Sequence, residues 1–238
     1  MIYGLASMGK ECIKQMHLLD TATHNVANVN TPGFKAEKVF FLEGSSAGGG
    51  SETAIVKEPL LRIDYSPAHV QKTGNVFDVA LGGDGFFVVE TKTGNGYTRN
   101  GRFSLNSEGT LVTQNGDYVL GTSGRITISG NDVQIDEKGA IRVDGGTVGS
   151  LKVVEFEKPE MLSNAGKGLL LDPNDTAGLK DKEDPAIHSG CLELSNVQAI
   201  REMVNMIRIH RSFEAYQKTM QTLQDQEKLS TTRIGRVG

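Results

Sequence analysis

The chain has 238 residues and a formal net charge of −4, with 25 basic and 29 acidic side chains. This balance gives no basic field of the kind that attracts a nucleic acid, so we expect no nucleic-acid partner. No run approaches the roughly 18 apolar residues that a membrane span needs, so we expect a protein that is not inserted in a membrane.

The first segment is predicted to form a helix over residues 2 to about 29. Apolar residues recur there at steps of three and four, which defines one stripe along a helix of roughly 40 Å. The stripe consists of Ile2, Leu5, Met8, Cys12, Met16, Leu19, Ala22 and Val26. The same residues lack the basic and then apolar regions of a secretory signal, so we expect no cleaved signal peptide.

This helix ends in the run NVANVNTPGF, residues 25–34. Pro32 biases Thr31 away from the helical conformation, and Gly33 tolerates backbone angles that other residues avoid. An ordinary helix end would account for Gly33, but it would not account for the density of asparagine. The run therefore indicates a segment that makes contacts beyond the end of its own helix.

The middle of the chain is predicted to be rich in β structure. Residues 36–75 are expected to be an extended linker that contains the flexible tract GSSAGGGSE and an extended run over residues 55–63. From residue 76 to residue 189, short β-prone runs alternate with turn signals that contain glycine, such as GFFVVE, TKTGNG and GRFSL. This pattern is typical of a small antiparallel β domain with hairpin turns.

Within the last segment, residues 190–238, a second long helix is predicted from about Leu194 to Leu229, capped by Ser195 or Asn196. Its pattern is close to a heptad that is broken near His210 and Arg211. Its stripe consists of Val197, Ile200, Met203, Val204, Ile207, Phe213, Tyr216, Met220 and Leu223. Each terminal helix would expose its stripe if it stood alone, so the helices are expected to pair with each other or with those of other copies. The predicted class is α+β, with residues 1–35 and 190–238 forming a helical domain.

No catalytic, cofactor or metal site is expected. His17 and His24 are seven residues apart, whereas a two-histidine metal site usually has i,i+4 spacing and a third ligand. Asp84 lies in a Gly-Asp-Gly turn, so Asp78 and Asp84 are not interpreted as an acid–base pair. Cys12 and Cys191 are expected to be free thiols. An enzyme is therefore not predicted.

Three stretches together resemble the bacterial flagellar rod and hook proteins. NVANVNTPGFKA resembles the signature of that family, in which the Asn, Thr, Gly, aromatic and Lys positions recur in this order. The stretch from FDVALGGDGFFVVE to YTRNGRFSL resembles the central β motif of the family. GCLELSNVQAIREMVNMIRIHRSFEAYQKTMQTLQDQ resembles its C-terminal helix.

The resemblance implies a structural subunit of the flagellar basal-body rod that polymerises helically in the periplasm to form the drive shaft. It implies export through the flagellar type III apparatus, and partners that are other copies and other rod proteins. It also implies that the terminal helices pair as an inner coiled coil, with the β domain over residues 76–189 outside. The short β region favours the rod over the hook, and RSFE at residues 211–214 with the tail RIGRVG favours the proximal over the distal rod.

The same resemblance assigns an assembly role to residues of the two terminal signatures. These are Asn25, Asn28, Asn30, Thr31, Gly33, Phe34, Asn196, Val197, Met203, Val204, Met206, Ile207, Arg211, Phe213 and Glu214. The asparagines are expected to bond to backbone carbonyls and to adjacent subunits, and Phe34 is expected to anchor the turn. A different class stays open, namely a β-type ligand-binding module on a helical oligomerisation stalk.

Overall fold

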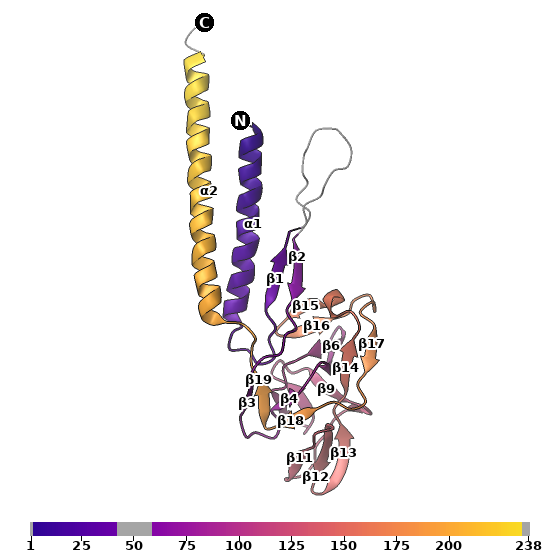
Figure 1. The fold of residues 1–238 in the computed structure, drawn as a ribbon. Coiled ribbons are helices and arrows are strands. Elements are labelled where there is room, and N and C mark those ends of the chain that lie inside the picture. The colour runs from indigo at the N-terminus through magenta and orange to yellow at the C-terminus, as the bar shows by residue number, and fades with distance from the viewer. Residues whose placement is uncertain (1, 42–58, 235–238) are drawn as a thin grey trace. The chain divides into compact units, whose positions relative to one another are not determined.

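A computed structural model describes residues 2–41 and 59–234 (Figure 1). The tract GSSAGGGSE, the start of the run over residues 55–63 and the last residues of the tail lie outside this description. The chain divides into two compact units. The helical unit comprises Met1–Ala27, Glu37–Asp64 and Val197–Gly238, and the β unit comprises Asn28–Ala36 and Tyr65–Asn196.

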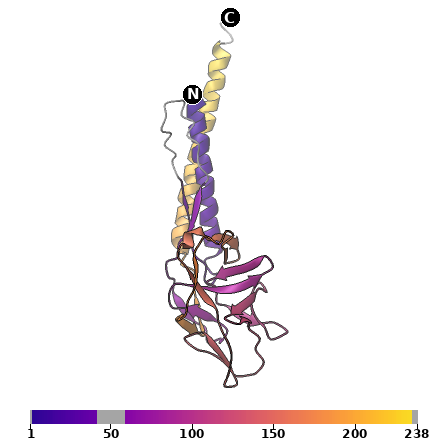
Figure 2. The ribbon, with the colours of Figure 1, turned by 90° about the vertical axis from the view of Figure 1, so that its right-hand side faces the viewer.

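The helical unit contains both helices and one strand pair. Helix α1 (Ile2–Ala27) and helix α2 (Ala199–Ile234) lie side by side and run in opposite directions (Figure 1 and Figure 2). Strand β1 (Glu37–Phe40) pairs with strand β2 (Leu60–Ile63) in antiparallel register. Within the described residues, neither α1 nor α2 contains a stretch that is both long enough and hydrophobic enough to span a membrane.

Helix α2 begins later than the sequence predicts. Its first helical residue is Ala199, and the Glu202 N–H donates to the Gln198 carbonyl at 3.0 Å. Ser195 and Asn196 therefore precede the helix and do not occupy the cap position. The Asn196 side chain instead bonds to segments of the β unit, as described below, so a tertiary contact replaces the predicted local one.

The β unit contains the remaining strands and one short 3-10 helix. In chain order these are β3 (Val70–Lys72), β4 (Val79–Leu81), β5 (Phe86–Thr91), β6 (Gly94–Thr98), β7 (Phe103–Leu105), β8 (Leu111–Thr113), β9 (Tyr118–Gly121), β10 (Gly124–Arg125), β11 (Val133–Ile135), β12 (Ala140–Val143), β13 (Gly146–Ser150), β14 (Val153–Phe156), η1 (Pro159–Met161), β15 (Ser163–Gly166), β16 (Leu169–Leu171), β17 (Leu179–Asp181), β18 (Ile187–Ser189) and β19 (Cys191–Glu193). The paired strands of this unit are antiparallel, which confirms the predicted kind of β structure.

The strands of the β unit form a ten-stranded sheet, a three-stranded sheet and two separate pairs. The largest sheet, called the inner sheet here, follows the order β15-β16-β6-β5-β9-β8-β7, with β10 on β9, β14 on β5 and β17 on β14. Strands β11, β12 and β13 form the three-stranded sheet. The separate pairs are β4 with β18 and β3 with β19. Each of these two pairs therefore joins an early and a late part of the unit.

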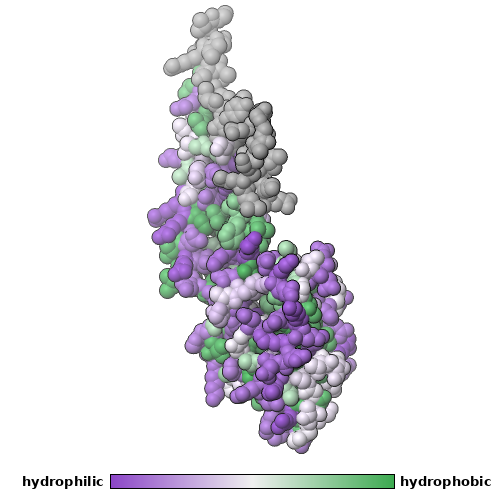
Figure 3. Space-filling model, turned by 45° about the vertical axis from the view of Figure 1, so that its right-hand side comes forward, coloured by the Kyte–Doolittle hydropathy of each residue, from purple (hydrophilic) through white to green (hydrophobic). Residues whose placement is uncertain are grey.

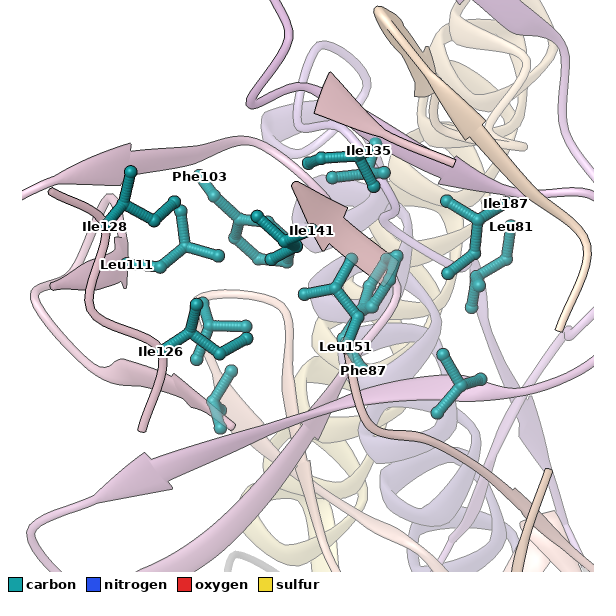
Figure 4. Packing of buried hydrophobic residues seen from close by; sticks show 14 of the residues in the cluster. Leu81, Phe87, Phe103, Leu111, Ile126, Ile128, Ile135, Ile141, Leu151 and Ile187 are labelled. Atoms are coloured by element: carbon teal, nitrogen blue, oxygen red, sulfur yellow. The ribbon is translucent and has the colours of Figure 1, made fainter. Parts of the chain in front are cut away.

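One hydrophobic core fills the β unit. Phe87 and Phe103 pack edge to face with ring centroids 5.2 Å apart, and Leu111 and Ile141 are fully buried beside them (Figure 4). Ile141 alternates with the exposed Arg142 along β12, whereas Phe87 and Leu111 lie in runs of consecutive buried residues in β5 and β8. Leu81 and Ile187 lie side by side in the same core, so β4 and β18 contribute to it as well.

The unit boundaries differ from the predicted domain boundaries at both junctions. Residues 28–35 were predicted in the helical domain and Ala36 in the linker, whereas Asn28–Ala36 lies in the β unit and its backbone bonds to residues before α2. The predicted linker over residues 36–75 contains paired strands in its described parts. Strands β1 and β2 belong to the helical unit, and β3 belongs to the β unit.

Candidate assembly segments

The first asparagine of the signature ties strand β1 to helix α1. Asn25 is 3% exposed, its Nδ2 donates to the Glu37 carbonyl and its Oδ1 accepts the Glu37 N–H, both at 2.9 Å. The Glu37 carboxylate also lies 3.1 Å from His24 Nδ1. One amide side chain thus satisfies both backbone groups of a strand residue, because it carries a donor and an acceptor side by side.

The rest of the run forms a tight turn after α1. The Thr31 N–H donates to the Asn28 carbonyl at 3.0 Å, and the Phe34 N–H donates to the Thr31 carbonyl at 3.2 Å. Asn28 is half-buried and also accepts the Thr31 hydroxyl at 3.3 Å, whereas Asn30 is exposed. The turn therefore accounts for Asn28 and Thr31 locally and leaves the Asn30 side chain at the surface.

Gly33 is required by both its conformation and its surroundings. Its φ is +68°, and its N–H donates to the Glu193 carbonyl at 2.8 Å. A Cβ at this position would overlap the backbone of Arg99 and Asn100. The glycine thus lets the turn pack directly against the loop after β6 in the β unit.

Lys35, Arg99 and Glu193 meet in a buried cluster, called the Lys35–Glu193–Arg99 cluster below. Lys35 Nζ donates to Glu193 Oε1 at 2.6 Å and to the Ser66 carbonyl at 2.8 Å. Arg99 Nη1 donates to the Gly83 carbonyl at 2.7 Å and lies 3.5 Å from Glu193 Oε2. The three side chains are only 4% to 7% exposed. Each of the three stretches that resemble the flagellar rod and hook proteins supplies one residue of this cluster.

Phe34 and Asn196 complete this junction. Phe34 is 4% exposed within the β unit, and its carbonyl accepts the Asn196 N–H at 3.4 Å. Asn196 Oδ1 accepts the Ala36 N–H at 2.7 Å, and Nδ2 donates to the Ser66 hydroxyl at 3.1 Å. Both residues therefore hold the segment Asn28–Ala36 in place inside one chain.

The predicted interface residues of α2 divide by exposure. Met203, Val204 and Ile207 are 49%, 43% and 54% exposed, and Ile200 is 81% exposed. Among the other predicted residues, Val197 is buried, Met206 and Phe213 are half-buried, and Arg211 and Glu214 are exposed. On the face drawn in Figure 3, hydrophobic residues reach the surface among polar ones in the helical unit. Part of the apolar surface of α2 is therefore not covered by the described residues of the chain.

Three residues that matter to this geometry were not selected from the sequence. Ile209 is 6% exposed, the lowest value among the described residues of α2, but it lies beside the heptad break at His210 and Arg211. Glu193 and Arg99 lie inside the resembling stretches, yet nothing local marks them as partners. Their charge alone does not distinguish them from other charged residues of the same stretches, such as Arg102.

A pocket of about 610 Å³ lies beside Arg99 within the β unit, between the loops around Pro67 and Gly83. Burial lowers the pKa of the Arg99 guanidinium, while the Glu193 and Asp84 carboxylates act in the opposite direction. Among the described residues, Arg99 Nε and Asp78 Oδ1 are buried without a hydrogen-bond partner. The buried charges are therefore incompletely satisfied.

Metal and redox chemistry find little support in the described parts of the chain. No group of three or more His, Cys, Asp or Glu residues there could hold a metal ion. Cys12 is buried and Cys191 is half-buried, and both are free, which confirms the predicted pair of unlinked thiols.

Comparison with known proteins gives matches to family models over two parts of the chain. Residues 80–143 match the flagellar hook protein FlgE/F/G D1 domain. Residues 188–228 match the C-terminal region of the flagellar basal body rod FlgEFG proteins. The two matches include Arg99 and Glu193 of the Lys35–Glu193–Arg99 cluster.

Individual relatives align along most of the chain. The flagellar basal-body rod protein FlgF of Caulobacter vibrioides is 32% identical, over 92% of each chain. FlgF of Mesorhizobium japonicum is 31% identical, over 82% of this chain and 83% of its own length. FlgG of Bacillus subtilis is 31% identical, over 86% of this chain and 88% of its own.

Proposed function

The chain belongs to the flagellar basal-body rod protein family, and from this premise we propose how it serves as a structural subunit of the rod. Helices α1 and α2 pair as a coiled coil, and the pairs of many copies pack together in a helical polymer with the β units outside. A subunit repeated by a rotation that does not close produces a filament and not a ring. The subunit is exported through the flagellar type III apparatus without a cleaved signal and assembles in the periplasm.

The observation that carries this proposal is the uncovered apolar surface of the helices. Ile200, Met203, Val204 and Ile207 follow the 3.6-residue period and share one face of α2, and each is at least 43% exposed. Ile13 and Met16 on α1 are also about half exposed. Burial of such side chains contributes roughly 25 cal/mol per Å², so packing against other copies stabilises the polymer.

The signature residues divide between two roles in this proposal. Asn25, Gly33, Phe34 and Asn196 make contacts within the chain that fix how the segment after α1 leaves its helix. The remaining polar members, Asn30, Arg211 and Glu214, are exposed and are proposed to bond to adjacent subunits. Asn28 and Thr31 belong to the turn that separates the two groups.

The proximal rod is the proposed position, because RSFE at residues 211–214 and the tail RIGRVG are closer to the FlgF form. Relatives named FlgG have nearly the same identity, so the distal rod is the alternative. The proximal and distal positions can be distinguished by whether the chain replaces a missing FlgF or a missing FlgG.

One experiment tests both parts of the proposal. Ile207→Lys places a charge on the uncovered face, and Gln217→Lys places the same charge at an exposed polar position of α2 as a control. Each chain is expressed in strains that lack their own FlgF or FlgG, and swimming and rod formation are scored. We expect the natural chain and Gln217→Lys to restore swimming in the strain lacking FlgF, and Ile207→Lys to fail although its purified form keeps its helix content.

Normal swimming with Ile207→Lys would contradict the proposed use of this face. Rescue of only the strain that lacks FlgG would move the chain to the distal rod and leave the packing proposal intact. The two parts of the proposal can therefore fail separately.

A further inference from the structure

The β unit combines contacts between nearby segments with contacts between its two ends. Within the inner sheet, Thr98 bonds to Gly168 across 70 residues. The contacts that close the unit are longer in sequence, at 113 residues for Ser189 with Val76 and 158 residues for Lys35 with Glu193. The closing layer is defined here as the segment Asn28–Ala36 with strands β3, β4, β18 and β19.

Loop-closure entropy makes the closing layer the last part of the unit to form. The cost of joining two segments grows with the length of chain between them, and contacts of long sequence separation form slowly. Strand β3 contributes no buried side chain to its pair with β19, whereas β4 and β18 bury Val79 and Ile187 in the shared core. The layer therefore joins the rest of the unit through contacts of longer sequence separation than those between β5 and β9 of the inner sheet.

Buried charge makes this closure cooperative. Lys35 and Arg99 share one carboxylate, that of Glu193, which also accepts the Ala68 N–H at 3.2 Å. If only one segment docked, a cation or the carboxylate would lie in a dry site without its partner, and that arrangement costs several kcal/mol. The segments carrying Lys35 and Glu193 thus dock together or stay in water together.

We propose that the Lys35–Glu193–Arg99 cluster is a lock that makes the closing layer open and close as one cooperative unit against an intact inner sheet. Glu193 is the positioning residue of this lock, because its carboxylate contacts both Lys35 and Arg99. The two buried atoms without partners, Arg99 Nε and Asp78 Oδ1, lower the free energy of opening, since both gain water when the layer leaves. The inference concerns one chain and does not depend on rod assembly.

The charge count of the cluster predicts unequal effects of its members. Replacing the one anion, as in Glu193→Gln, leaves two buried cations without a carboxylate. Replacing one cation, as in Lys35→Met, leaves Arg99 and Glu193 as a neutral pair. Loss of Glu193 should therefore open the layer much more often than loss of Lys35.

Hydrogen exchange of the dilute full-length chain, followed by mass spectrometry of peptides, tests the lock. We expect Glu193→Gln to raise exchange by at least about 30-fold, together, in residues 28–36, 70–81 and 187–196. Lys35→Met should raise exchange in the same segments by less than about 10-fold. Peptides from β5 and β9 should stay within about twofold of the natural chain in both variants. Glu90→Gln, which removes the exposed partner of Arg125, serves as the control and should change none of the closing segments.

Two results would overturn the lock. A uniform rise across β5, β9 and the closing segments would show that the β unit opens only as a whole. A rise confined to the peptides that hold residues 35 and 193 would show that the layer does not move as a unit. If Glu193→Gln does not fold, Lys35→Met alone separates these outcomes from the predicted one, because it keeps a paired carboxylate.

Discussion

The β unit buries a large apolar core within one chain, whereas the helical unit leaves many of its large apolar residues exposed. Phe87, Leu111 and Ile141 are completely buried in the β unit. In contrast, Ile200 and Ile207 on α2 are 81% and 54% exposed. The comparison indicates that the β unit carries the stability of the single subunit, while the helical unit keeps apolar surface for contacts with other copies.

The signature run is divided between the two units and serves each in a different way. Asn25 belongs to the helical unit, where it bonds to the backbone of Glu37 in β1. Gly33 and Lys35 belong to the β unit, where they contact Glu193. One continuous stretch of sequence thus fixes the exit of the chain from the first unit and the closure of the second.

The largest expected effect is the loss of a core ring in the β unit. Phe87→Ala removes a fully buried side chain that packs against Phe103, so we expect a loss of about 3–5 kcal/mol in the free energy of unfolding. The matched change in the other unit, Ile200→Ala, should cost less than about 0.5 kcal/mol in dilute protein. Urea unfolding measures both, with tyrosine fluorescence following the β unit and circular dichroism at 222 nm following the helices.

The proposed difference between the two units would be contradicted if Ile200→Ala destabilised the dilute chain as much as Phe87→Ala. Such a result would mean that the face of α2 carrying Ile200 is already covered in solution, for example by self-association at low concentration. Repeating the measurement over a range of protein concentrations distinguishes these cases, because only an associated form changes stability with concentration.

Much of this division could be predicted from local patterns. Steps of three and four in the apolar residues gave both helices, and short runs separated by glycine turns gave an antiparallel β region between them. These signals are local, because helix and hairpin periodicity depend on neighbours a few residues apart. The signature positions Asn25 and Gly33 were selected from signals of the same local kind, since asparagine density and a Pro-Gly pair are visible in the sequence itself.

Contacts between distant residues could not be predicted in the same way. The bond between Lys35 and Glu193 joins residues 158 positions apart, and periodicity contains no information about such a pair. The helical stripe of α2 likewise does not tell which of its apolar residues face α1. Ile209 lies at the break in the heptad and is buried, whereas Met203 and Val204 fit the heptad and are about half exposed.

A second prediction concerns the role of Gly33 in the β unit. Gly33→Ala adds a Cβ that overlaps the backbone of Arg99 and Asn100 at a positive φ, so we expect a loss of about 2–3 kcal/mol. Gly74→Ala is the control, since its φ is +81° but a Cβ there would meet nothing within 4 Å. Equal losses in the two variants would show that backbone strain alone matters and that close packing of the turn does not.

The smallest expected effect concerns Asn25, a hydrogen-bonded residue of the helical unit. Asn25→Ala removes two hydrogen bonds that satisfy Glu37 and leaves its N–H and carbonyl to find other partners, so we expect a loss of about 1–2 kcal/mol. Asn30→Ala, at an exposed position five residues further on, should cost less than about 0.5 kcal/mol. Hydrogen exchange at β1 measures the difference locally, and faster exchange of β1 only in Asn25→Ala is the expected result. If both variants leave β1 protected, another contact holds this strand, and the value of Asn25 to the rod lies outside the single chain.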